Sequence, residues 1–214
     1  MARPRGNYAV TAERRATILQ SAFEVFAKYG YRGGSLKDIA EIVGISEAGI
    51  LHHFKTKSNL LIAVLTYRDD ISSEFVSPES ANGAEFIDGW LKLIKYNSGI
   101  PGVIELFTIL SAEATAVDHP AHEYFKQRYD FVIGITTKFF AMLREEGRLR
   151  PDIEPDGAAR ALIALSDGLQ VQWLLHKEWD MLEEHRGFLR GVLTEQAGRA
   201  LVPVNGAPLM AAGM

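Results

Sequence analysis

The chain has 214 residues, of which 47% are hydrophobic and 23% charged, a composition typical of a soluble globular protein of one or two domains. The sequence contains no cysteine, which excludes disulfides, thiolate metal sites and cysteine nucleophiles. No apolar run is long enough to span a bilayer, and the basic N-terminal residues are not followed by the apolar segment of a signal peptide. We therefore expect a cytoplasmic protein without membrane contacts.

Charge is distributed unevenly along the chain, whose formal net charge is −4. Residues 1–68 hold ten Lys and Arg against five Asp and Glu, whereas residues 69–214 hold thirteen against twenty-two. A basic head joined to an acidic body indicates two parts, of which the N-terminal one could bind nucleic-acid phosphates.

Helical periodicity dominates the sequence, and no segment shows the alternation of a strand bounded by turn residues. The pattern predicts an all-α fold of about nine helices. Four lie in the head, over residues 11–29, 36–43, 47–53 and 57 into the seventies. Thr11 is the predicted cap of the first helix, and Gly30 ends it.

The body has five predicted helices, over residues 84–97, 101–117, 120–147, 156–177 and 180–200. We assign residues 1–68 to the head domain and residues 69–202 to the body domain. Residues 203–214 are rich in Pro, Gly and Ala, so we expect a disordered tail there.

The informative segment runs from Ser35 to Phe54. Two short predicted helices meet at Gly44, where a residue tolerant of positive φ is needed, and the small Ala40 allows a close crossing. The apolar wedge between the two helices consists of Ile39, Val43, Ile45 and Ile50. This pattern predicts a helix-turn-helix, whose second helix enters the major groove of DNA.

From about Thr11 to Leu65, the head resembles the DNA-binding domain of TetR-family transcriptional regulators. The matching segments are Phe26-Ala-Lys-Tyr-Gly30, Ser35-Leu-Lys-Asp-Ile-Ala40, Val43-Gly-Ile-Ser46, and His52-His53-Phe54 followed by Lys57 and Leu60-Leu61. The resemblance implies an N-terminal three-helix helix-turn-helix DNA-binding domain and a C-terminal helical ligand-binding and dimerisation domain.

The resemblance also implies the DNA contacts. By position, the phosphate contacts would be Ser35, Lys37, Ser46, His52, His53 and Lys57, and the residues nearest the base edges would be Glu47, Ala48, Gly49 and Leu51. The family commonly has Lys or Arg in place of Glu47 and Tyr in place of Leu51. A glutamate can accept a hydrogen bond from cytosine N4, which predicts a different selectivity.

Several of these residues have an alternative structural role. Ser35 and Ser46 stand where helix caps are expected, with or without DNA. One histidine of the pair, His53 rather than His52, could pack beneath Phe54, and Lys57 could be a solvated lysine at a helix start.

Because one helix-turn-helix reads only a few base pairs, we predict a homodimer that places two copies one turn of DNA apart. The predicted interface lies in the last two helices, at Leu162, Leu165, Leu169, Phe188 and Val192, which could instead belong to the core of one chain.

The body is rich in bulky side chains with a few polar groups among them, as an effector pocket or a tight core would be. We predict a pocket for an unidentified small organic effector, lined by Trp90, Phe107, Glu113, Tyr129 and Trp173. The predicted function is a repressor that binds a palindromic operator as a dimer and is released by this effector, without a cofactor.

Two alternatives remain from the sequence. His119 and His122, with Glu113 and Glu123, could be metal ligands of a metal-responsive regulator. The sequence has no nucleophile elbow, phosphate-binding loop or metalloprotease motif, so we expect neither a metal centre nor an enzyme. A helical adaptor without DNA binding is the second alternative, and it would lack a salt-dependent affinity for DNA.

Overall fold

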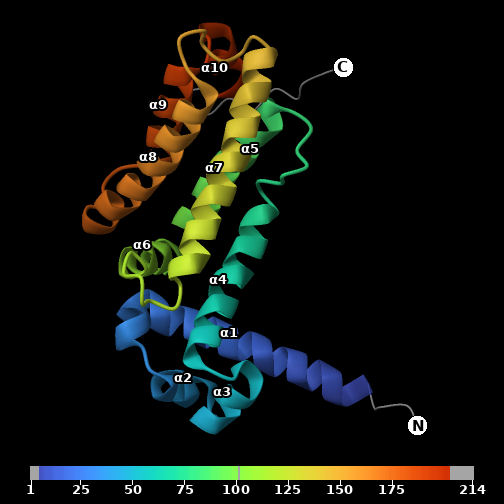
Figure 1. Cartoon of the computed structure of the whole chain (residues 1–214), viewed down its shortest axis with the longest axis vertical. Coiled ribbons are helices and arrows are strands. Elements are labelled where there is room, and N and C mark those ends of the chain that lie inside the picture. Colours follow the sequence, from blue (N-terminus) through green and yellow to red (C-terminus); the bar gives the residue numbers. More distant parts are fainter. Residues whose placement is uncertain (1–4, 101, 203–214) are drawn as a thin grey trace. The chain divides into compact units, whose positions relative to one another are not determined.

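The computed structural model describes residues 5–100 and 102–202. In this part of the chain the regular structure is helical apart from one antiparallel bridge, between Leu149 and Leu193, which confirms the predicted all-α fold. The ten helices of the described residues (Figure 1) are α1 (Arg5–Gly33), α2 (Leu36–Val43), α3 (Glu47–Phe54), α4 (Lys57–Ser73), α5 (Gly83–Ser98), α6 (Val103–Glu113), α7 (His122–Glu145), α8 (Pro155–Leu175), α9 (Met181–Val192) and α10 (Glu195–Leu201). The predicted tail at residues 203–214 lies outside the described residues.

The chain forms two compact units, and each unit is discontinuous in sequence. The first comprises Met1–Asp70 and Pro101–Phe125, and the second comprises Ile71–Ile100 and Lys126–Met214. Helix α6, which the sequence analysis assigns to the body, packs extensively against α1 of the head. A Cβ on Gly102, at the start of α6, would lie 3.3 Å from Ala27 Cβ and 3.4 Å from Phe23 Cε1.

The two short helices of the head begin and end through local hydrogen bonds. Ser35 Oγ accepts a hydrogen bond from the Asp38 N–H at 3.1 Å, and the Asp38 carboxylate accepts from the Ser35 N–H, a capping box. Gly44 ends α2 in the left-handed conformation (φ 71°), which costs a glycine little. Ser46 Oγ accepts from the Gly49 N–H at 3.1 Å and so caps α3. The predicted helix-turn-helix is therefore well defined by local chemistry.

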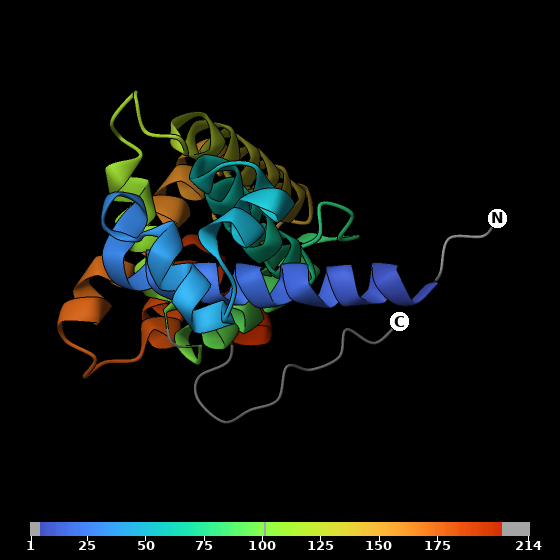
Figure 2. The ribbon, with the colours of Figure 1, turned by 90° about the horizontal axis from the view of Figure 1, so that it is seen from below.

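The head has one apolar core. Ile39 of α2 and Ile50 of α3 are fully buried, and α2 packs against both α1 and α3 (Figure 2). Burying a side chain of this size contributes about 2 kcal/mol. The other two residues of the predicted wedge, Val43 and Ile45, are half-buried. The wedge therefore fixes α3 against the rest of the head.

Helix α1 differs from the prediction at both ends. It begins at Arg5, so Thr11 lies inside the helix and is not its cap. Gly30 does break the helical conformation, with φ 67° and ψ −175°, although the helix assignment extends to Gly33. A non-glycine residue would be strained at Gly30, because its φ lies in the left-handed region.

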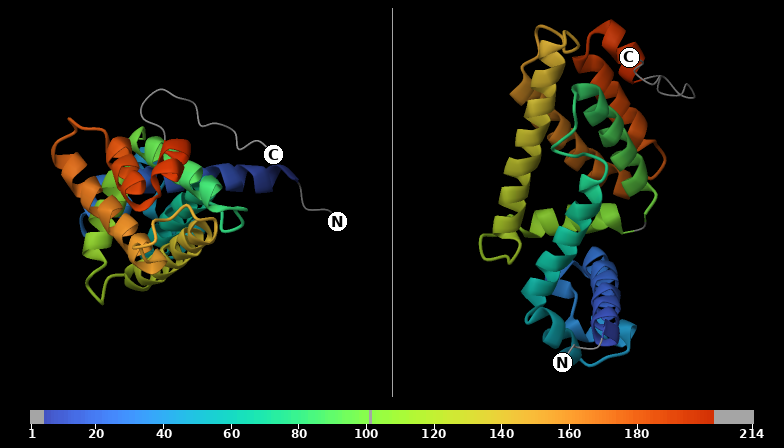
Figure 3. Two further views of the ribbon diagram at one scale, coloured as in Figure 1. Left: turned by 90° about the horizontal axis from the view of Figure 1, so that it is seen from above. Right: turned by 90° about the vertical axis from the view of Figure 1, so that its right-hand side faces the viewer.

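In the second unit, α9 packs against α5, α8 and α10 (Figure 3), and Phe86 of α5 stacks on Phe139 of α7 with ring centroids 4.7 Å apart. The predicted single helix over 180–200 is wrong, because the structure has two helices there. The Arg150 N–H donates to Val192 O at 3.0 Å, and the Thr194 N–H donates to Arg148 O at 2.8 Å. These bridge bonds use backbone groups that a continuous helix would need. Among the described residues, no helix combines the length and apolar character required to cross a membrane.

Candidate functional site

Helix α3 presents one open face and one buried face. Ile50 and Phe54 are buried, whereas the predicted base-reading residues Glu47 and Ala48 are exposed, and Gly49 and Leu51 are half-buried. The open face therefore carries one carboxylate among small and aliphatic groups. Such a face can accept a hydrogen bond from cytosine N4 and contact thymine methyl groups.

The three predicted phosphate contacts before α3 differ in whether their hydrogen-bond donors are accessible. Both donors of Ser35 are used within the capping box, because its hydroxyl donates to Asp38 Oδ2 at 2.6 Å and its backbone N–H donates to the same oxygen. Ser46 is exposed, and its Oγ acts as a cap acceptor. Lys37 is exposed, with Nζ 3.9 Å from Glu41 Oε1. A phosphate contact by Ser35 would thus require the capping box to open, whereas Lys37 is accessible.

Lys57 turns into the head. Its Nζ donates to Tyr31 O at 2.5 Å and lies 4.4 Å from the centroid of the Tyr31 ring. Burial lowers the pKa of Lys57, and the nearby Glu113 opposes that shift. The structure therefore places the ammonium group in an internal contact, not in the exposed position that the predicted phosphate contact requires.

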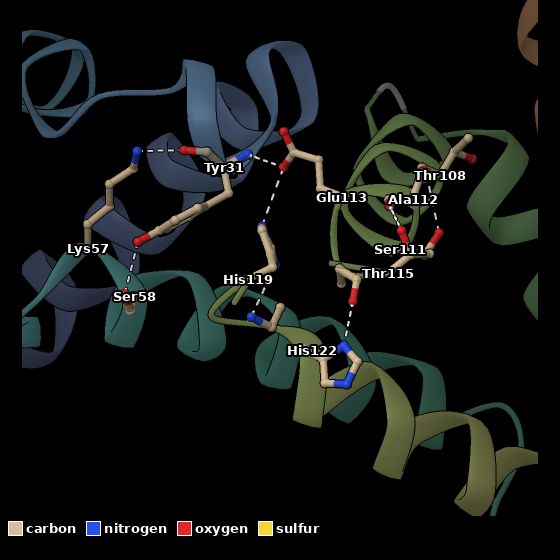
Figure 4. Close-up of polar contacts among 12 residues, drawn as sticks. Tyr31, Lys57, Ser58, Thr108, Ser111, Ala112, Glu113, Thr115, His119 and His122 are labelled. Atoms are coloured by element: carbon tan, nitrogen blue, oxygen red, sulfur yellow. Dashed lines mark hydrogen bonds and ion pairs between the residues drawn. The ribbon is translucent and has the colours of Figure 1, made fainter. Parts of the chain in front are cut away.

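Tyr31 is the centre of a polar cluster that joins three helices and a loop (Figure 4). Its backbone N–H donates to Glu113 Oε2 of α6 at 2.7 Å, and its hydroxyl lies 2.9 Å from Ser58 Oγ of α4. The His119 ring meets the Tyr31 ring edge-on at a centroid distance of 5.2 Å. We call Tyr31, Lys57, Ser58, Glu113 and His119 the Tyr31 cluster. It holds the end of α1 to α4 and α6 within the first unit.

Glu113 therefore corrects a prediction. Its carboxylate binds the backbone at the end of α1, and a Cβ on Gly30 would lie 2.6 Å from Glu113 Oε1, so the side chain is packed against the head. It does not have the free polar group expected of an effector-binding residue. Sequence reasoning could not see this, because Tyr31 and Glu113 are 82 residues apart.

The two histidines proposed as metal ligands have separate partners. His119 Nδ1 accepts from the Ala121 N–H at 3.2 Å, which leaves the proton of the neutral ring on Nε2, 3.6 Å from Glu113 Oε2. Burial lowers the pKa of His119, only partly offset by Glu113. His122 Nδ1 lies 2.9 Å from Ala114 O. Within the described ranges, no group of three or more His, Asp or Glu is arranged to hold a metal ion.

The predicted pocket residues are divided between the two units. Phe107 and Glu113 belong to the first unit, whereas Trp90, Tyr129 and Trp173 belong to the second. Phe107 is half-buried, and its ring meets that of Phe125 edge-on at a centroid distance of 6.5 Å.

The three aromatics of the second unit differ in their polar contacts. The Tyr129 hydroxyl donates to Asp167 Oδ2 at 2.8 Å. Trp173 is half-buried, with Lys177 Nζ 4.8 Å from its ring centroid. Trp90 is 9% exposed, and its indole N–H is buried without a hydrogen-bond partner.

A buried polar pair lies beside Trp90. The His185 ring is 6.3 Å from the Trp90 ring and is fully buried, with Nε2 2.9 Å from Ser166 Oγ and Nδ1 2.8 Å from Met181 O. Burial lowers the pKa of His185. The surroundings of Trp90 thus combine the apolar ring of Phe86, the unpaired indole N–H of Trp90 itself and a buried histidine.

The predicted interface residues are mostly internal to one chain. Leu162, Leu169 and Val192 are 0%, 7% and 8% exposed, so they have little surface to bury against another copy. Leu165 and Phe188 are half-buried and keep some accessible surface. The first three therefore belong to the core, which is the alternative left open by their periodicity.

A different set of apolar and small residues is accessible on α8 and α9, two helices that pack together. Val171 and Leu175 are 47% and 73% exposed. The set also contains Ala161, Ala164, Gly187 and Gly191, which are all exposed. We call these six residues the α8–α9 face.

Three basic residues near the end of α3 were not predicted from the sequence as site residues. Arg15 of α1 donates to His53 O at 3.3 Å and lies 4.2 Å from the centroid of the Phe54 ring, and Arg14 is exposed beside it. Lys55 adopts φ 67° and ψ −49°, and the Thr56 N–H donates to Phe54 O at 2.8 Å, which together define a classic γ-turn. The two-residue connection between Phe54 and Lys57 was the available signal for this tight turn.

Comparisons with known proteins agree with this geometry. The model of the family described as "Bacterial regulatory proteins, tetR family" matches residues 18–64, the segment that contains α2 and α3. The HTH-type transcriptional regulator RutR of Escherichia coli is 41% identical over 63 residues, which are 29% of this chain and 29% of RutR. The match to that relative is thus confined to less than a third of either protein.

Two further similarities extend over most of the chain. The HTH-type transcriptional regulator TtgR of Pseudomonas putida is 27% identical over 180 residues, or 76% of this chain and 81% of TtgR. The structure of TylP, a TetR regulator from Streptomyces fradiae, is similar with a TM-score of 0.65 and 25% identity over 89% of this chain and 91% of TylP. The similarity therefore includes both the head and the helical body.

Proposed function

Because residues 18–64 match the tetR family of bacterial regulatory proteins, we propose that this chain is a DNA-binding transcriptional regulator of that family, a dimeric repressor that a small organic effector releases from a palindromic operator. The observation that carries the proposal is the capped α2–Gly44–α3 unit, whose second helix keeps an open face while Ile50 and Phe54 fix the other. An exposed helix held in this way fits the major groove. Such a regulator would act in the cytoplasm, the compartment that contains the bacterial chromosome.

The contacts to DNA divide into two groups. Glu47, Ala48, Gly49 and Leu51 lie on the side of α3 that faces the bases, and the polar and basic groups around them bind phosphates. Lys37 is the accessible phosphate ligand on α2, whereas Lys57 supports the head from inside through Tyr31. This assignment revises the role of Lys57 and leaves the base-reading positions unchanged.

Dimerisation is needed because one recognition helix covers too few base pairs for useful selectivity. The α8–α9 face supports it, since exposed Val171 and Leu175 stand beside small residues that allow two helices to approach closely. Two copies of α8 and α9 would form a four-helix bundle across a two-fold axis. Leu165 and Phe188 lie partly accessible on the same helices.

The effector site is proposed around Trp90. A buried indole N–H without a partner costs free energy, so a bound molecule with an acceptor atom would be stabilised there. The Phe86 ring, whose centroid is 5.9 Å from that of Trp90, makes the surroundings of this N–H apolar. Such an effector would favour the conformation that does not bind the operator.

The test begins with the full-length protein and a random double-stranded DNA library. Repeated selection should enrich a palindrome, and fluorescence anisotropy should show tight binding of one dimer to it and weak binding to a shuffled control. Affinity should fall steeply as salt rises, because several phosphate contacts release counterions. Enrichment of no sequence would refute the proposal and favour the adaptor alternative.

The effector is tested by screening small organic molecules for loss of operator binding. Trp90→Phe keeps an aromatic side chain, smaller than the indole, and removes the N–H donor, so it should weaken the response to an active compound while leaving operator affinity intact. Trp173→Phe, in the same unit, is the matched control and should respond like the wild type. Equal responses of all three proteins would move the site away from Trp90.

A further inference from the structure

Basic groups from α1 and α3 meet at the C-terminal end of the recognition helix. Arg15 donates to His53 O at 3.3 Å, with its guanidinium 4.2 Å from the Phe54 ring centroid, and the His52 and His53 rings meet edge-on at 5.6 Å. Arg14, Arg15 and His52 are exposed, and His53 is half-buried. We call Arg14, Arg15, His52 and His53 the arginine–histidine patch.

The patch disfavours a proton on His53 in the free protein. Burial lowers the pKa of His53, and the neighbouring His52, Arg15 and Arg14 lower it further. Arg14 and Arg15 are the fixed positive charges of the patch.

Apart from Lys55, which is exposed directly after α3, the other charged groups near the helix-turn-helix have partners or lie away from the patch. On α2, Asp38 is bound to Ser35 and Glu41 pairs with Lys37. Glu47 stands at the opposite end of α3, and Lys57 of α4 is bound to Tyr31 O. Glu13 is the exposed carboxylate that precedes the two arginines on α1. The patch is therefore the place where positive charge is concentrated beside the recognition helix.

A phosphodiester next to the patch opposes the effects that lower the pKa of His53. Its negative charge offsets the arginines and its oxygens accept hydrogen bonds from imidazolium N–H groups, which favours the charged form of the His53 ring. The C-terminal end of a helix, which carries a partial negative charge, favours a cation at this position as well. A phosphate is the partner that this combination of groups fits.

We propose, on the basis of the DNA-binding function above, that the arginine–histidine patch binds operator phosphates and that His53 takes up a proton as it does so. Affinity for DNA therefore rises as the pH falls, because the protonated protein is the form that binds more tightly. Arg14 and Arg15 are assigned here as phosphate ligands from α1, in addition to the residues of the helix-turn-helix.

The size of the effect follows from linkage. A histidine whose pKa rises by about one on binding raises the affinity by up to about tenfold between a pH well above and a pH well below both values. Between pH 8 and pH 6, we expect a gain of about fivefold from His53.

The experiment measures binding of the full-length protein to its selected palindrome by fluorescence anisotropy at pH 6, 7 and 8 and constant ionic strength. Isothermal titration calorimetry in two buffers of different ionisation enthalpy gives the number of protons taken up, and it needs no variant. His52→Gln combined with His53→Gln should abolish most of the pH dependence. His176→Gln, at an exposed histidine of the second unit, is the matched control and should retain it.

The outcomes separate this inference from the proposed function. Selective binding with equal affinity at pH 6 and 8 and no proton uptake would overturn the inference alone. Wild-type pH dependence in the double histidine variant would also overturn it, because the titrating groups would lie elsewhere. Enrichment of no DNA sequence at pH 6 or pH 8 would refute the regulator itself. Arg14→Gln and Arg15→Gln should each weaken binding to all DNA sequences and reduce the salt slope by about one.

Discussion

Replacing Lys55 by glycine should make the protein more stable and a weaker DNA binder. Lys55 has φ 67° and ψ −49°, a conformation that is strained for a residue with a Cβ. Removing the Cβ relieves about 2 kcal/mol, and the greater freedom of glycine in the unfolded chain takes back about 0.7 kcal/mol. The expected gain is about 1 kcal/mol, or roughly 2–4 °C in Tm for a protein of this size.

The same change removes an exposed ammonium group beside the end of the recognition helix. We expect the salt slope of operator binding to fall by about one, as for one lost phosphate contact. Lys55→Ala is the matched control, because it removes the charge and keeps the strain. Urea unfolding and anisotropy titrations on the three proteins provide the measurements. An equal gain in stability for Lys55→Ala, or a loss for Lys55→Gly, would refute the reasoning from strain.

Three further predictions follow. Gly49→Ala should stabilise the protein by up to about 1 kcal/mol, since the new Cβ would lie at an ordinary van der Waals distance of 3.5 Å from Ile45 Cδ1. Repeated DNA selection with this variant should show an altered base preference. A lower stability in urea unfolding would contradict the prediction. Val171→Glu should dissociate the dimer in sedimentation velocity while leaving urea unfolding of the chain nearly unchanged, whereas Val117→Glu, at a more exposed valine, should leave the dimer intact. Burial lowers the pKa of His185 below its ordinary 6.5, so the unfolded chain binds the proton first and stability should fall as the pH drops below 6.5, by up to about 1.4 kcal/mol per pH unit. His185→Gln should reduce that dependence, and an unchanged pH profile would count against it.

Sequence reasoning succeeded where the determining contacts are local. Ser35 and Asp38 are three residues apart, as are Ser46 and Gly49, so their capping bonds can be predicted from spacing alone. The turn at Gly44 is equally local, because its left-handed φ is a requirement of one residue. The helix-turn-helix was accordingly predictable almost to the residue.

It failed where a role depends on a partner distant in the chain. Lys57 meets Tyr31 across 26 residues and Glu113 meets Tyr31 across 82, and no periodicity reveals either pair. The break between α9 and α10 has the same origin, since the strand-like pairing of Leu193 depends on Leu149.

The predicted interface residues show a related limit of pattern reasoning. Leu162 and Leu165 both recur at helical spacing on α8, but Leu162 is fully buried and Leu165 keeps some accessible surface. Apolar periodicity indicates that a face is covered, and it does not indicate whether the cover comes from the same chain or from another copy.

The interleaved chain path of the first unit limits how the head can be transplanted. Exchanging DNA-reading heads between regulators by a single crossover near residue 70 would separate α1 from α6 and leave Glu113 and Gly102 of the recipient facing a foreign helix. A chimaera that keeps the native surroundings of Phe23, Ala27 and Tyr31 must carry residues 101–125 along with the first 70. Point substitutions on the open face of α3 change the groups that face DNA and leave this packing intact.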